Sequence, residues 1–291
     1  MKKIFTLLLA LTLLTSLVAC NNSTGNTNKK ATEEITGTSS ETKADTETKT
    51  DEDNKIIIGV SPVPHAEITE ALKDEFAKEG LDVEVKVFDD YVQPNLALDQ
   101  GDIDANFFQH IPYLENFAKE RGLSLENLGS VHIEPMGLYS DKIKSLDELK
   151  DGDEVLIPSD PSNGRRALLL LEKNGLIKLK DDTKEDITEK DIDQNTKNLK
   201  FTPIEAANIP NVYKDAALAA INTNFALGAG LNPSADALAL EDKDSPYANI
   251  IAVRKGDETK DKFQKLIKVF QSDACKKFIE DTYKGEIYPA F

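Results

Sequence analysis

Residues 88–114 read Phe88-Asp89-Asp90-Tyr91-Val92-Gln93-Pro94-Asn95-Leu96-Ala97-Leu98-Asp99-Gln100-Gly101-Asp102-Ile103-Asp104-Ala105-Asn106-Phe107-Phe108-Gln109-His110-Ile111-Pro112-Tyr113-Leu114. Acidic residues and a glycine divide this stretch into a turn, a short helix, a second turn, a short strand and a helix from about Pro112. Five rings lie within it: Tyr91, Phe107, Phe108, His110 and Tyr113. Rings gathered at a strand-to-helix junction suit a pocket for a small, partly apolar ligand, although each ring is also a candidate for the core.

Short apolar strands alternate with amphipathic helices on both sides of this stretch. Strands at 55–60 and 83–88, with a helix between them, predict a βαβ unit whose two strands are parallel. Further strands are predicted at 131–139, 154–158, 199–204 and 247–253, and helices at 167–171 and 258–283. This alternation predicts an α/β fold. Residues 55–291 are long for one doubly wound domain, so two lobes are expected.

The N-terminus has the features of a secretory signal. Lys2 and Lys3 precede an apolar run over 4–17, which is short for a membrane-spanning helix. Leu17-Val18-Ala19-Cys20 resembles the bacterial lipoprotein signal, in which the cysteine is lipidated after cleavage; an ordinary signal peptide with an incidental cysteine is the alternative. We therefore expect a signal peptide over 1–19, a lipidated Cys20, and a disordered polar tether over 20–54.

Composition excludes several classes of function. The formal net charge of −17 argues against nucleic acid and against electrostatic attraction to anionic lipid. After cleavage only Cys275 would remain as a thiol, so no internal disulfide or zinc-binding cysteine pair is expected.

Metal and enzyme chemistry are also disfavoured. His65, His110 and His132 could form a zinc or manganese site with an acid, but no pair has close ligand spacing, and no metal is predicted. Neither a Gly-x-Ser-x-Gly elbow nor a His-Glu-x-x-His helix occurs. The chain is therefore predicted to be no enzyme and to need no cofactor.

Polar residues at two kinds of junction are candidates for ligand binding. The run Ser159–Arg166 precedes an apolar helix, where free backbone N–H groups and an arginine on the first turn could bind a carboxylate or phosphate. The alternative is that Asp160 or Ser162 caps this helix and the arginines are solvated. Asn222, Asn224 and Asn249 offer donor and acceptor together, which suits a zwitterionic group, although each could be a turn residue.

Four stretches, 88–114, 158–171, 220–226 and 244–249, together resemble the methionine-binding lipoproteins of ABC importers, the NlpA/MetQ-type family. The likeness covers essentially all of 55–291 and the lipidation motif. It implies a two-lobed periplasmic-binding-protein fold of type II, in which each lobe is a mixed sheet flanked by helices and the ligand cleft lies between the lobes. We expect lobe 1 to comprise 55–138 plus 248–291, and lobe 2 to comprise 139–247.

The resemblance also implies which residues bind the ligand. Arg166 would bind the methionine carboxylate, although Arg165 stands where the family often has glycine, so the choice between the two arginines stays open. Asn222 and Asn249 would hold the amino and carboxylate groups. The thioether side chain would lie against Tyr91, Phe108, His110 and Tyr113.

A lipid-anchored, extracytoplasmic receptor on the cell membrane follows as the expected function. It would be a monomer that captures methionine, as the L- or the D-enantiomer, and delivers it to the membrane permease of an ABC transporter. Its partners would be the permease and ATPase subunits of that transporter. Two alternatives remain: a protein that binds a Met-containing dipeptide such as Gly-Met, and a surface interaction lipoprotein with a vestigial cleft.

Overall fold

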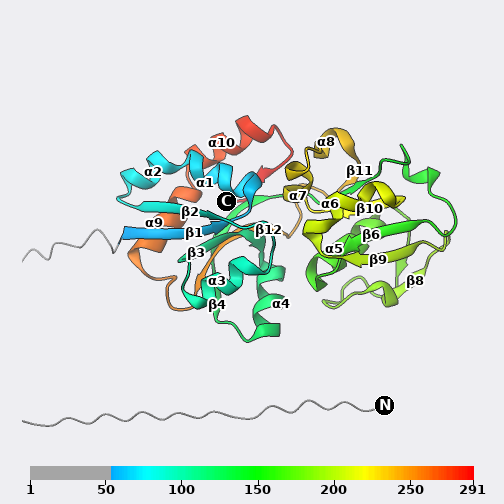
Figure 1. Cartoon of the computed structure of the whole chain (residues 1–291), viewed down its shortest axis with the longest axis horizontal. Helices are drawn as coiled ribbons and strands as arrows, with labels where there is room; N and C mark the ends of the chain where they lie inside the picture. Colours follow the sequence, from blue (N-terminus) through cyan, green and yellow to red (C-terminus); the bar gives the residue numbers. More distant parts are fainter. Residues whose placement is uncertain (1–53) are drawn as a thin grey trace, which may run out of the picture. The chain divides into compact units, whose positions relative to one another are not determined.

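Two mixed β-sheets, each flanked by helices, make up the computed structural model, which describes residues 54–291 (Figure 1). The predicted signal segment 1–19, Cys20 and nearly all of the predicted tether 20–54 lie outside the described residues. None of the described helices is both long and apolar enough to cross a bilayer.

The first sheet has six strands. The pairs around β1 are parallel, and the pairs around β12 are antiparallel. Strand β1 runs parallel to β2 and β3, which confirms the predicted βαβ unit, whereas β12 runs antiparallel to β3 and β4. In sheet order the strands are β13 (Tyr288–Pro289), β4 (Leu125–Ile133), β12 (Ala248–Arg254), β3 (Ala105–His110), β1 (Lys55–Val60) and β2 (Asp82–Val87). Its helical segments are η2 (Pro62–Ala66), α1 (Glu67–Ala71), α2 (Lys73–Lys78), α3 (Gln93–Gln100), α4 (Ile111–Arg121), α9 (Asp261–Phe270) and α10 (Asp273–Tyr283).

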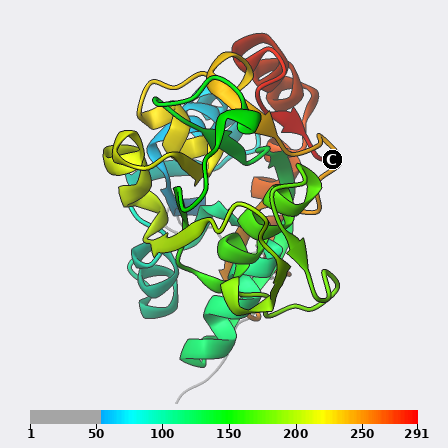
Figure 2. The same ribbon diagram turned by 90° about the vertical axis from the view of Figure 1, so that its right-hand side faces the viewer.

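The second sheet has five strands and is also mixed, since β6 is parallel to β9 and β10 while β5 is antiparallel to β10 and β11. Figure 2 looks onto the molecule from the side of this sheet. In order, the strands are β11 (Ala237–Leu240), β5 (Gly137–Tyr139), β10 (Leu218–Ile221), β6 (Glu154–Pro158) and β9 (Lys200–Ile204), with a separate pair, β7 (Lys178–Leu179) and β8 (Ile192–Gln194). The helical segments are η3 (Leu146–Glu148), α5 (Pro161–Lys173), η4 (Glu189–Asp191), η5 (Ala206–Asn208), α6 (Ile209–Val212), η6 (Tyr213–Asp215), α7 (Thr223–Gly228) and α8 (Pro233–Asp236).

Each sheet has its own hydrophobic core. In the first, β-branched residues of β1 such as Ile56 and Ile58 pack with Phe107 of β3 and Phe270 of α9, all fully buried. In the second, the apolar face of α5 packs with residues of β6 and β10. The sequence pattern therefore predicted the two-lobed α/β architecture correctly, because the longer strands and helices carry apolar faces that pack into these cores.

Two element predictions were wrong in detail. The run 131–139 is not one strand: residues up to Ile133 belong to β4 of the first sheet, and Gly137–Tyr139 form β5 of the second. Pro135, which has no backbone N–H to give to a sheet, lies between them. The expected boundary after residue 138 thus falls inside β5. Similarly, 258–283 divides into α9 and α10, because Ser272 caps the second helix by accepting the Cys275 N–H.

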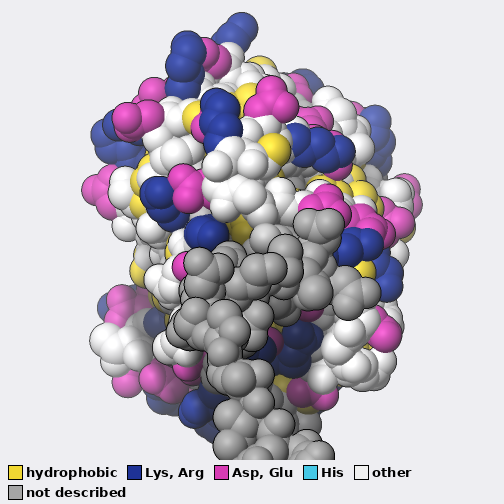
Figure 3. Space-filling view, turned by 90° about the vertical axis from the view of Figure 1, so that its left-hand side faces the viewer, with side chains coloured by type: hydrophobic (Ala, Val, Ile, Leu, Met, Phe, Trp, Pro, Cys, Tyr) yellow, Lys and Arg dark blue, Asp and Glu magenta, His cyan; other side chains and the backbone are white. Residues whose placement is uncertain are grey.

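The face of the first lobe seen in Figure 3 carries basic and acidic side chains intermixed. Such a surface has no large region of a single sign on that side. The mixed charge on that face does not indicate a site for a charged ligand.

Candidate ligand-binding site

A small cavity lies between the two lobes and is lined by residues of both. All seven residues predicted for the ligand site line it. The complete lining is Tyr91, Phe108, Gln109, His110, Tyr113, Glu134, Asn163, Arg166, Asn222, Thr223 and Asn249. Sequence reasoning missed Gln109, Glu134, Asn163 and Thr223.

Three aromatic rings of the first lobe form one wall of the cavity. The ring centroids of Tyr91, Phe108 and Tyr113 lie 5.6–5.9 Å from one another. Phe108 lies in β3, five residues before Tyr113 in the first turn of α4, and the Tyr113 hydroxyl donates to the Tyr91 carbonyl at 2.9 Å. Aromatic edges and faces at this spacing suit an apolar or sulfur-containing side chain.

Two hydrogen bonds join the lobes across the cavity. The Tyr91 hydroxyl donates to Asn224 Oδ1 at 2.5 Å, and His110 Nε2 lies 3.1 Å from Asn163 Oδ1. His110 Nδ1 accepts the Tyr113 N–H at 3.2 Å, so the neutral ring carries its proton on Nε2 and donates to Asn163. Burial, together with the Arg166 charge, lowers the pKa of His110 to about 3, so this ring is neutral at physiological pH.

The N-terminus of α5 is capped from within the chain. Asp160 accepts the Asn163 N–H at 2.9 Å and also bonds the Asn163 amide group, so its own carboxylate takes the place expected for a ligand anion. Capping by Asp160, one half of the alternative, is therefore confirmed, whereas its other half, solvated arginines, is wrong for Arg166, which is buried. The helix starts at Pro161, which moves Arg166 from the first turn into the second.

The two arginines have different surroundings. Arg166 is 2% exposed and lines the cavity, whereas Arg165 lies outside it, where it donates to the carbonyls of Asp182 and Lys184. Arg166 Nε and Nη2 donate to Glu241 at 2.5–3.0 Å, and among residues 54–291 Nη1 has no hydrogen-bond partner. Although burial alone would lower the pKa of Arg166, the Glu241 charge and hydrogen bonds raise it, so the guanidinium stays charged.

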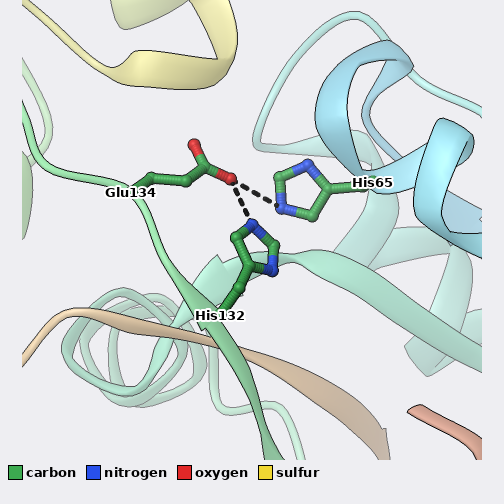
Figure 4. A group of neighbouring side chains, drawn as sticks. All are labelled: His65, His132 and Glu134. Atoms are coloured by element: carbon green, nitrogen blue, oxygen red, sulfur yellow. Dashed lines mark hydrogen bonds and ion pairs between the residues drawn. The ribbon is translucent and has the colours of Figure 1, made fainter. Parts of the chain in front are cut away.

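Glu134 and two histidines form a buried cluster at the edge of the cavity (Figure 4). Glu134 Oε1 lies 2.7 Å from His132 Nε2 and 3.3 Å from His65 Nε2. His132 and Glu134 lie two residues apart at the end of β4, a spacing that places both on one face of an extended chain. That spacing is the signal from which Glu134 could have been predicted, but its contact with His65 could not.

The hydrogen bonding of the two histidines bears on whether this cluster could hold a metal ion. A metal-bound imidazole generally donates its second N–H to an acceptor. Here the Nδ1 atoms of His65 and His132 are buried and have no hydrogen-bond partner in the part of the chain that the structure describes. A neutral ring with its proton on Nε2, donating to Glu134, accounts for that better than ligation, so the cluster fits hydrogen bonding rather than a metal. His110 is not part of it.

The cavity combines a charged arginine, an Asn222 amide oxygen without a partner among the described residues, a carboxylate and an aromatic wall, held between two lobes. Such a combination of groups suits a small ligand that is partly charged and partly apolar. Fold and site together define the class of two-lobed substrate-binding proteins. The chain belongs to the NlpA lipoprotein family, whose model matches residues 56–291, a family of substrate-binding lipoproteins and not of enzymes.

Relatives support the assignment over most of the chain. The chain is 46% identical over 237 residues to a D-methionine-binding lipoprotein, MetQ, of Salmonella typhi, covering 80% of this chain and 88% of that protein. It is 43% identical over 232 residues to outer membrane lipoprotein 3 of Mannheimia haemolytica, covering 79% and 88%. A nutrient-binding protein from Burkholderia cenocepacia, solved bound to methionine, matches with a TM-score of 0.79 and 46% identity, covering 81% of this chain and 100% of that one.

Proposed function

We propose that this protein is a lipid-anchored, extracytoplasmic substrate-binding protein of an ABC importer that captures methionine. Cys20 carries the lipid after removal of residues 1–19, and residues 20–54 tether the lobes 55–138 plus 248–291 and 139–247 to the membrane. The permease and ATPase subunits of the transporter receive the ligand when the lobes open. The observation that carries the proposal is one cavity that contains Arg166, Asn222 and Asn249 opposite a wall of aromatic rings.

Each part of methionine has a counterpart in this cavity. Arg166 Nη1 and the Asn249 amide group are available as donors to the ligand carboxylate, and Asn222 Oδ1 is a buried acceptor with no partner in the structure. Tyr91, Phe108, His110 and Tyr113 surround the thioether chain. A hinge between the lobes admits the ligand, since the bonds from Tyr91 to Asn224 and from His110 to Asn163 must open for entry.

The free energies expected for these contacts are consistent with micromolar binding of methionine. A hydrogen bond to a charged group contributes about 1.5–3 kcal/mol, and burial of a methionine-sized side chain contributes about 1.5–3 kcal/mol. Micromolar binding needs roughly 8 kcal/mol, so neither contact suffices alone and the ammonium group must contribute as well.

Calorimetry tests the proposal directly. Any co-purified ligand is first removed by partial unfolding in denaturant, and the refolded protein is titrated with L-methionine, D-methionine and Gly-Met. We expect saturable heat with at least one free methionine enantiomer and weaker binding of the dipeptide. Absence of heat with both enantiomers would refute the proposed function, and tighter binding of Gly-Met would move the ligand class to dipeptides.

A further inference from the structure

Asn224 joins three parts of the molecule, although it is not among the residues that line the described cavity. It lies in the first turn of α7 in the second lobe and is 4% exposed. Its side-chain oxygen Oδ1 accepts the hydroxyl of Tyr91 from the first lobe at 2.5 Å. Its main-chain N–H donates at 3.0 Å to Glu134 Oε2, in the segment between β4 and β5. Asn224 is one of the candidates that the sequence offers for ligand binding, but these contacts are to other protein groups.

The main chain of Asn224 is held on the segment that connects the two sheets. Glu134 Oε1 accepts from His132 Nε2 at 2.7 Å, which fixes the carboxylate from the first lobe and directs Oε2 away from the histidines (Figure 4). Oε2 accepts the Asn224 N–H. The hydroxyl of Thr223 donates to the carbonyl of Pro135 in the same connecting segment. The start of α7 is therefore bound to this segment through two neighbouring residues.

The side chain of Asn224 reaches from the second lobe to the first, beside the cavity. Tyr91 lines the cavity, and its hydroxyl donates to Asn224 Oδ1. Burial raises the pKa of Tyr91 well above its ordinary value, so the hydroxyl keeps its proton. The Tyr91 ring also packs against Phe225, the next residue of α7, with ring centroids 4.7 Å apart. Because a hinge motion moves one lobe relative to the other, opening separates Tyr91 from both residues of α7.

We propose that Asn224 is a latch, a positioning residue that stabilises the closed arrangement of the lobes and so slows release of a ligand that it does not touch. The connecting segment holds its main chain so that Oδ1 meets the Tyr91 hydroxyl when the lobes close. This inference rests on the proposed function and adds a residue that sets how long methionine stays bound, not which ligand is chosen. Because the ligand enters and leaves the open form, the latch acts on the dissociation rate and not on the association rate.

The experiment measures the release of bound methionine. Protein loaded with the radiolabelled enantiomer that gives saturable heat is mixed with an excess of unlabelled ligand, and the bound label is followed with time. Asn224→Ala removes Oδ1 and keeps the main-chain N–H, so it should raise the dissociation rate constant and Kd together by about 2- to 12-fold, the range for one neutral hydrogen bond. The association rate constant should stay within about twofold of the wild-type value. Asn211→Ala, at an exposed position of α6, is the matched control and should change none of these values.

Two comparisons distinguish a latch from a ligand contact or a general loss of packing. Tyr91→Phe removes the other partner of the bond and should raise the dissociation rate constant by a factor in the same range. In that background Asn224→Ala should add less than about twofold, because the bond is already absent. The second comparison uses norleucine, in which a methylene replaces the sulfur of methionine. Asn224→Ala should weaken norleucine and methionine by the same factor, because Asn224 touches neither ligand.

The outcomes separate the latch from the proposed function. Release at the wild-type rate in both Asn224→Ala and Tyr91→Phe would overturn the latch, as would a change confined to the association rate or an altered preference between methionine and norleucine. In each of these cases the wild-type protein still binds methionine, and the proposed function stands. If the wild-type protein binds neither enantiomer, the proposed function fails first and the latch with it. Tyr91→Phe gives an answer even if Asn224→Ala does not fold.

Discussion

Arg166 forms an ion pair with Glu241, and this pair makes hydrogen bonds to both chain segments that connect the two sheets. Arg166 Nη2 and Nε lie 2.5–3.0 Å from the Glu241 carboxylate, and Nη2 also donates to the Glu134 carbonyl at 2.6 Å. Glu134 lies in the segment between β4 and β5, and Glu241 in the segment between β11 and β12. The Met136 N–H donates to Glu241 at 2.9 Å. A residue predicted to hold a ligand is therefore also in contact with both crossings between the lobes.

Glu241→Gln should destabilise the protein strongly. The substitution leaves the Arg166 charge buried without its carboxylate, and breaking one partner of a buried pair costs about 3–5 kcal/mol. The neighbouring Asp242→Asn is the matched control, because Asp242 pairs with Lys173 at an exposed position and such pairs contribute about 0–1 kcal/mol. Denaturant unfolding of both variants measures the difference, and equal free energies of unfolding would show that the buried pair has no structural role.

The two arginines should differ sharply in their effect on ligand affinity. Arg166→Ala removes the guanidinium in the cavity and should weaken methionine by at least about 10-fold, as expected for loss of a hydrogen bond to a charged group. Arg165→Ala removes contacts to Asp182, Lys184 and Tyr247 at the outside and should change affinity by less than about threefold. Calorimetry with methionine measures the affinity of both variants. Similar losses of affinity would contradict the assignment of Arg166 to the ligand carboxylate.

Features formed by residues that are close in the sequence could be predicted from the sequence alone, whereas contacts between distant residues could not. The aromatic wall could be predicted because Tyr91, Phe108 and Tyr113 are close in sequence and their elements follow from periodicity and turn residues. The division of 131–139 could not, because it depends on which sheet each half joins. The pairing of Arg166 with Glu241 joins residues 75 positions apart. The contact of Glu134 with His65 likewise arises only when η2 and the end of β4 come together in the fold.

His65 and His110 should remain neutral down to an unusually low pH. The pKa of His65 is lowered to about 4 and that of His110 to about 3, in each case chiefly by burial, from an ordinary value of 6.5. Nuclear magnetic resonance of the ring protons between pH 7.5 and 4.5 should show little titration of either residue. Midpoints near 6.5 in the folded protein would contradict their burial as neutral rings.

The same shifts predict how stability depends on pH. Between pH 6.5 and about 4 the unfolded chain takes up protons at these two histidines and the folded protein does not, so lowering the pH favours unfolding. The free energy of unfolding is not reduced by these two rings above about pH 6.5. Below that pH it falls progressively, by on the order of 3 kcal/mol for each fully buried ring. Unfolding free energies at pH 7.5, 6 and 5 should fall in that order, and a flat profile would argue against the predicted shifts.

Gly164 sets how closely α5 approaches the end of β6, and with it the position of Asn163 and Arg166. A Cβ at Gly164 would lie 2.9 Å from the Pro158 carbonyl oxygen, a main-chain atom that cannot turn aside. Gly164→Ala should therefore cost about 1–3 kcal/mol through strain and shift the helix that carries Arg166, weakening methionine as well. Gly228→Ala in α7 is the matched change, because a Cβ there meets no atom within 4 Å, and it should stabilise the protein by up to about 1 kcal/mol. Thermal unfolding and calorimetry on both variants test this contrast, and it would be contradicted if Gly164→Ala were as stable as Gly228→Ala.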